Sequence, residues 1–153
     1  MSHERLIEEI EFEITLINTH LTKYRDLIEE SREREPDLIQ LTALASVVHS
    51  FYNGIERIFI IVSKRLDNEI PDGKQWHREL VQQITSGTSK RNAVISESTK
   101  EKILPYLAFR HFYRHSYSYV LSWSELRSLI NPLEDIWEEV KSELREFLDE
   151  HRE

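Results

Sequence analysis

The sequence predicts an all-α protein, an antiparallel helical bundle with four or five main helices. Three observations favour this fold class. Apolar residues recur every three or four positions along most of the chain, and no stretch shows the strict alternation of a half-buried strand. Only three glycines and four prolines interrupt the 153 residues, which is typical of long helices joined by few turns. We expect residues 1–153 to form one domain.

Two long helices are expected in the first half of the chain. Apolar residues at helical spacing predict a helix over about residues 3–34. Pro36 disfavours helix at the residue before it and can begin the next helix, which we expect over about residues 37–67. Because residues 51–62 are apolar nearly all round, this second helix should be the central element of the bundle.

Turn and capping signals divide the second half. Pro71-Asp72-Gly73 ends the second helix, and a shorter helix over about residues 74–86 precedes a loop over residues 86–96. Ser98, with Glu101 three residues later, has the pattern of a capping box and predicts a helix that runs to about residue 116.

The last two helices are marked in a similar way. Ser122 with Glu125 predicts a second capping box, and Asn131-Pro132 should begin the last helix. Pro105 lies inside the preceding helix and is expected to bend it.

Composition and charge exclude several classes of site. The chain has no cysteine, so disulfides, zinc–thiolate sites and cysteine nucleophiles are excluded. We expect a cytoplasmic protein, because neither a secretory signal nor a membrane-spanning run is present. The formal net charge is −8, yet residues 74–115 hold eight basic and three acidic side chains. This basic middle is therefore the surface on which a polyanion would bind.

The segment from Arg110 to Tyr117 contains the residue types of a phosphate-handling site. Arginine is a permanently charged, forked donor, and histidine exchanges protons near neutral pH. On a continuous helix, Arg110, Arg114 and Tyr117 share one stripe and His111 and His115 the next. Arg110 and His115 would be separated by roughly 140° around the axis. Either the helix ends near His115, or a second copy of the chain supplies the missing partner.

Plainer interpretations of the same residues remain open. His111 and His115 have the i,i+4 spacing of helical zinc ligands, but no third ligand is evident, and we expect no metal site. Arg110 and Arg114 could simply pair with acidic helix faces.

Three further polar residues also have plain interpretations. We interpret Asn53 and Glu56, on a mostly apolar helix, as partners of backbone groups, with orientation of the arginine–histidine site as the alternative. His77, next to Trp76, is interpreted as structural.

The segment resembles the signature of the HEPN superfamily, and more narrowly that of HepT-like ribonuclease toxins. Their motif is Arg, four residues, His, one residue and Tyr, which Arg110, His115 and Tyr117 satisfy. One branch of the family also resembles this chain at residues 51–58 and 76–80.

The resemblance implies a homodimeric, metal-independent endoribonuclease without a cofactor. Arg110 and His115 would be catalytic, and His111 and Arg114 would support them or contact RNA. Many members of the superfamily have a polar residue, often Asn, directly after the motif arginine, where this chain has His111, so either histidine could be the principal acid or base.

The resemblance also implies a partner. An antitoxin of the MNT nucleotidyltransferase type would neutralise the toxin by AMPylation of Tyr117, and neither DNA nor a membrane is an expected partner. The alternative function is a non-catalytic helical subunit that binds such a nucleotidyltransferase.

Overall fold

The computed structural model describes residues 3–115 and 121–152. Within these ranges the chain is helical without a β-strand, apart from an isolated bridge between Thr88 and Arg91. The all-α prediction is therefore confirmed. The helices are α1 (Glu4–Lys23), α2 (Arg25–Glu33), α3 (Leu38–Val62), the π-helical turn η1 (Ser63–Asp67), α4 (Trp76–Ile84), α5 (Glu97–His115), α6 (Trp123–Ile130) and α7 (Leu133–Glu150).

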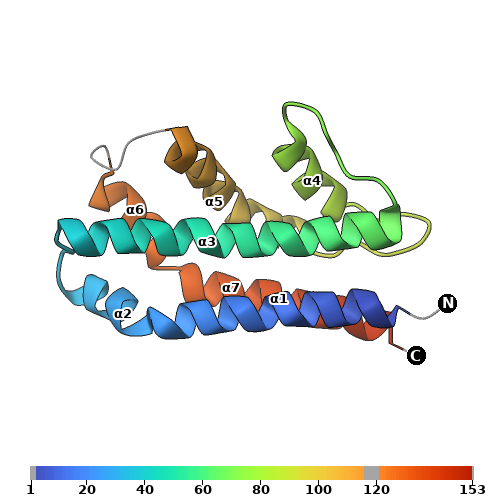
Figure 1. Cartoon of the computed structure of the whole chain (residues 1–153), viewed down its shortest axis with the longest axis horizontal. Helices are drawn as coiled ribbons and strands as arrows, with labels where there is room; N and C mark the ends of the chain where they lie inside the picture. The colour runs from blue at the N-terminus through green and yellow to red at the C-terminus, as the bar shows by residue number, and fades with distance from the viewer. Residues whose placement is uncertain (1–2, 116–120, 153) are drawn as a thin grey trace.

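Helix α3 is the central element, as its apolar sequence predicts. It lies along the middle of the molecule, with α1 and α7 on one side and α4, α5 and α6 on the other (Figure 1). Successive long helices α1, α3, α5 and α7 run in alternating directions, and both chain ends lie at the same end of the bundle (Figure 1). The buried apolar side chains form one continuous cluster.

One boundary prediction needs correction. The helix expected over residues 3–34 is interrupted at Tyr24, whose backbone angles (φ −105°, ψ 8°) are not helical. Neither glycine nor proline marks this break in the sequence. The helix expected over residues 37–67 corresponds to α3 and η1 together, and only its last turn is π-helical. The next residue, Asn68, has a positive φ of 53°.

Both predicted capping boxes are wrong, although each helix begins close to its expected position. Helix α5 begins at Glu97, one residue before Ser98, because the cap is Ser96, whose hydroxyl accepts a hydrogen bond from the Thr99 backbone N–H (3.2 Å). Helix α6 begins directly after Ser122, whose hydroxyl lies 2.8 Å from that of Ser124 and does not cap the helix.

Helices α1 and α3 approach each other closely at Gly54. A Cβ atom at this position would lie 2.7 Å from Cγ1 of Ile17 and 2.9 Å from its Cδ1. Only glycine therefore allows the two helix backbones this separation without displacing the buried Ile17 side chain.

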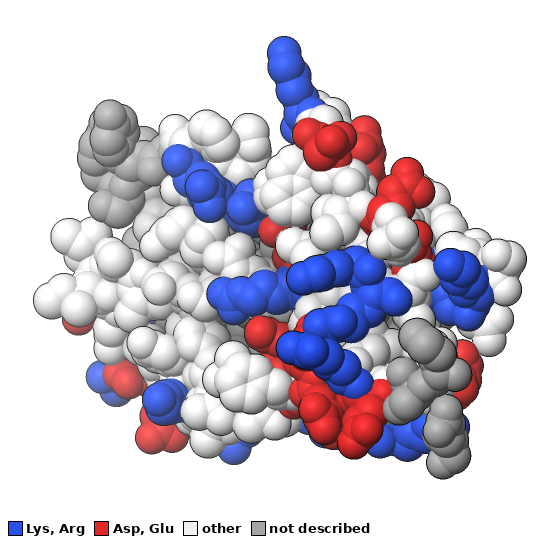
Figure 2. Space-filling view, turned by 45° about the vertical axis from the view of Figure 1, so that its right-hand side comes forward, with Lys and Arg blue, Asp and Glu red and all other residues white. Residues whose placement is uncertain are grey.

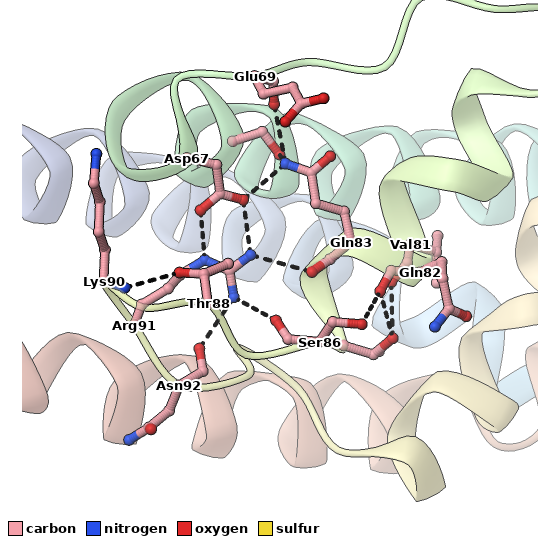
Figure 3. A network of polar contacts seen from close by, with 12 residues as sticks. Asp67, Glu69, Val81, Gln82, Gln83, Ser86, Thr88, Lys90, Arg91 and Asn92 are labelled. Atoms are coloured by element: carbon pink, nitrogen blue, oxygen red, sulfur yellow. Dashed lines mark hydrogen bonds and ion pairs between the residues drawn. The ribbon is translucent and has the colours of Figure 1, made fainter.

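A buried ion pair holds the loop after α4 against η1, the turn that follows α3 (Figure 3). Arg91 donates to both carboxylate oxygens of Asp67, at 2.8 and 2.7 Å, and also to the backbone carbonyls of Gln83, Ser86 and Asn92. Burial alone would raise the pKa of Asp67, but hydrogen bonds from Arg91 and Gln83 outweigh it and hold this pKa below its ordinary value. The pair fixes α4 relative to α3.

Helix α5 is held at two levels. At its start, the Ser96 N–H donates to Glu143 of α7 (2.6 Å), and Thr99 donates to the same carboxylate. In its middle, the buried Tyr106 hydroxyl donates to the Leu129 carbonyl of α6 (2.6 Å). The last two turns, which carry the Arg110–His115 segment, therefore project from a fixed base.

None of the helices in the described ranges is long and apolar enough to cross a membrane.

Candidate active site

Arg110 turns inward from α5 toward α3. Its Nε lies 3.3 Å from Oδ1 of Asn53 and 3.8 Å from Oε1 of Glu56, and 13% of its side chain is exposed. Neither terminal nitrogen of the guanidinium makes a hydrogen bond to another residue of the described ranges. The arginine is thus anchored through Nε, while its two terminal nitrogens are the forked donors that an oxyanion binds.

Glu56 is shared between Arg110 and a histidine from α4. Nδ1 of His77 donates to Oε2 of Glu56 (2.7 Å), while Oε1 faces Arg110. Only 8% of the Glu56 side chain is exposed. A buried carboxylate requires such partners, because desolvation strongly disfavours an unpaired charge. The first turn of α4 is therefore connected to the arginine site through one carboxylate.

His49 extends the polar cluster along α3. Asn53 Nδ2 lies 3.1 Å from Nε2 of His49, and the imidazole stacks on the Tyr113 ring with centroids 4.6 Å apart. Burial lowers the pKa of His49, and the positive charges of Arg110 and Arg114 lower it further. Both effects favour the neutral imidazole of His49.

Two buried polar atoms in this cluster lack a hydrogen-bond partner among the described residues. They are Nδ1 of His49 and the hydroxyl of Tyr52. Burial raises the pKa of Tyr52, as does the charge of Glu56, so the phenol stays neutral. Buried polar atoms normally have a hydrogen-bond partner, so two unpaired polar atoms in one cluster distinguish this region from the apolar core.

His111 and His115 lie on the exposed side of α5, away from Arg110. Their ring centroids are 4.4 Å apart. The His111 carbonyl accepts a hydrogen bond from Nδ1 of His115 (2.8 Å), so in the neutral imidazole Nε2 is the basic nitrogen. Arg114 is also exposed. Helix α5 thus presents Arg110 and His115 to different sides, as their spacing predicts, and Tyr117 lies outside the described residues.

The interpretation of Asn53 and Glu56 as backbone partners is wrong, since both contact the Arg110 side chain. His49 was not predicted at all. The signal for it is spacing, because His49, Asn53 and Glu56 lie four and three residues apart and so share one stripe of an otherwise apolar helix. Which partner that stripe faces depends on helix packing.

Two further observations concern charge and metals. On the face shown in Figure 2, basic and acidic side chains lie beside each other. Ion pairs such as Arg57–Glu13 join α3 to α1. No group of three or more histidine, aspartate or glutamate side chains within residues 3–115 and 121–152 is placed to hold a metal ion.

Comparison with known proteins identifies the family. The profile of a family described as HepT-like protein matches residues 43–151, which include α3 from its second turn onward and all of α4 to α7. No curated protein and no solved structure gave a significant match. Because the matched region covers more than half of the chain and contains every residue of the cluster around Arg110, the chain belongs to the HepT-like family.

Proposed function

We propose that this protein is a metal-independent endoribonuclease, the toxin of a HEPN–MNT toxin–antitoxin system. Membership of the HepT-like family suggests a ribonuclease of the HEPN type. The observation that carries the proposal is the state of Arg110, whose Nε is anchored while its terminal nitrogens make no hydrogen bond to a described residue. This arrangement suits an arginine that binds a phosphate.

The proposed reaction is an in-line attack of a ribose 2′-oxygen on the adjacent phosphorus. Nε2 of one His115 accepts the 2′ proton as the O2′–P bond forms. The P–O5′ bond breaks, and a second imidazole donates a proton to the leaving oxygen. Arg110 stabilises the charge that develops on the phosphoryl oxygens. The products are a 2′,3′-cyclic phosphate and a 5′-hydroxyl.

The site requires two subunits in this proposal. Arg110 faces α3 whereas His115 is exposed, so one subunit does not direct both groups to a single phosphate. A two-fold axis beside the end of α5 would bring Arg110 and His115 of both subunits together. His111 and Arg114, exposed on the same turns, would contact the RNA.

The proposed regulation acts on Tyr117. A nucleotidyltransferase antitoxin would transfer AMP from ATP to the tyrosine oxygen with release of pyrophosphate. The attached phosphodiester would occupy the anion site that the RNA phosphate requires. Mass spectrometry of the peptide containing residues 110–117, after co-expression with the antitoxin, should detect an AMP-sized adduct on Tyr117. An unmodified peptide would refute this regulation.

A ribonuclease assay on unmodified protein tests the activity. We expect cleavage in the presence of EDTA, with a 2′,3′-cyclic phosphate product, and a loss of about 100-fold or more for His115→Ala and Arg110→Ala. Two residues far from the site in the sequence provide controls: the half-buried His151 and the exposed Arg145, whose replacements His151→Ala and Arg145→Ala should cleave at the wild-type rate.

Other outcomes would overturn the proposal. Loss of activity with EDTA would indicate a metal site at the histidines. Unmodified wild-type protein that cleaves no RNA would favour the non-catalytic binding subunit. Sedimentation showing a monomer at assay concentration would contradict the two-subunit site.

A further inference from the structure

One carboxylate, Glu56, lies between a histidine and the arginine of the site. Its Oε2 accepts the hydrogen bond from His77 (2.7 Å), and its Oε1 lies 3.8 Å from Nε of Arg110, beyond hydrogen-bond distance. Each oxygen of the Glu56 carboxylate therefore faces a different partner, His77 for Oε2 and Arg110 for Oε1. Arginine and a carboxylate otherwise tend to form a bidentate pair, with two parallel hydrogen bonds and closer approach.

We propose that His77 is a positioning residue that keeps Glu56 from forming a bidentate ion pair with Arg110. By holding Oε2, the imidazole leaves Arg110 anchored to Asn53 through Nε, and the terminal nitrogens remain available to an oxyanion. The inference rests on the proposed role of Arg110 as the phosphate-binding group.

Loss of the imidazole has a defined consequence. Without His77, Oε2 of Glu56 is a buried, unpaired anionic oxygen, since 8% of the side chain is exposed. Arg110 already faces the other oxygen of this carboxylate, so the carboxylate would turn and occupy the terminal nitrogens of Arg110. The guanidinium would then be neutralised by its own subunit and unable to bind a phosphate.

The placement of α4 makes this arrangement possible. His77 lies in the first turn of α4, while the far end of the same helix is fixed by the Arg91–Asp67 network (Figure 3). The His77 ring also lies against the Trp76 indole, with centroids 3.5 Å apart. A second contact therefore restricts where the imidazole points.

A double-mutant cycle tests the inference with inorganic phosphate as the probe. We expect His77→Ala to weaken phosphate binding about tenfold, measured by calorimetry, and to raise KM for RNA by a similar factor, which is the scale of one lost charge-assisted contact. In the Glu56→Gln background the same change should have an effect of less than about threefold, because a neutral amide cannot sequester Arg110.

Controls separate positioning from folding. His20→Ala removes another half-buried helical histidine, one that contacts the Val47 carbonyl, and should leave phosphate binding unchanged. Circular dichroism at 222 nm confirms that each variant is folded. Equal losses for His77→Ala in both backgrounds, or no loss in either, would overturn the inference.

Failure of the inference is distinguishable from failure of the proposed function. If the wild-type protein cleaves RNA but the double-mutant cycle shows no coupling between His77 and Glu56, only the positioning role is contradicted. Coupling in phosphate binding without any RNA cleavage supports the positioning role and refutes the ribonuclease.

Discussion

Replacement of Arg91 by methionine should be among the most destabilising single changes in this protein. The Arg91 side chain is fully buried and Asp67 is 6% exposed. Among the described residues, Arg91 donates five hydrogen bonds, two to the Asp67 carboxylate and three to backbone carbonyls (Figure 3). Arg91→Met removes every donor while retaining a side chain of similar length.

The magnitude follows from the charge that is left behind. Removing one partner of a buried ion pair costs about 3–5 kcal/mol, because the remaining charge is desolvated and unpaired. We therefore expect the free energy of unfolding to fall by about 4 kcal/mol and Tm by roughly 8–16 °C. Since domains are stable by only about 5–15 kcal/mol, a large share of the stability would be lost.

The pH dependence follows from the lowered pKa of Asp67. A carboxyl whose folded pKa is lowered stabilises the fold above its unfolded pKa of about 3.9. That contribution is lost as the pH falls through the folded value. The difference between wild type and Arg91→Met should therefore shrink in acid.

Urea unfolding followed by circular dichroism at 222 nm measures these effects. Lys90→Met changes the exposed neighbouring residue and should shift the free energy of unfolding by less than about 0.5 kcal/mol. Asp67→Leu combined with Arg91→Met removes the orphaned charge and should recover at least about 1 kcal/mol. A loss below about 1 kcal/mol for Arg91→Met alone would refute the reasoning.

Two further predictions concern α3. Gly54→Ala should lower the free energy of unfolding by about 1 kcal/mol, because overpacking against Ile17 outweighs the gain in helix propensity. Gly73→Ala is the control, since the nearest atom to a Cβ at Gly73 would be 4.0 Å away. A Gly54→Ala variant more stable than the wild type would contradict the close approach of α1 and α3. The pKa of His49, followed by NMR, should lie below its ordinary value of 6.5 and should rise in the Arg110→Met variant. A pKa at or above 6.5 in the wild type would show that the ring is not buried beside the arginines.

Local signals in the sequence were sufficient for the helices but not for their junctions. The apolar periodicity of α1 and α7 sets which face of each is buried, and Pro36 and Pro132 mark helix starts. The break at Tyr24 and the cap at Ser96 escaped prediction. Several nearby serines can cap a helix equally well from sequence, and tertiary contacts such as Ser96 with Glu143 decide between them.

The sequence by itself determined the fold class, the central position of α3 and the divergence of Arg110 and His115 on α5, because helical periodicity is a property of a single segment. Only the tertiary structure decided that His49, Asn53, Glu56 and His77 belong to the Arg110 cluster. Together with Arg110 these residues come from three helices, and which polar groups meet depends on how the helices pack. A buried carboxylate requires a partner, but the sequence does not say which cation will provide it.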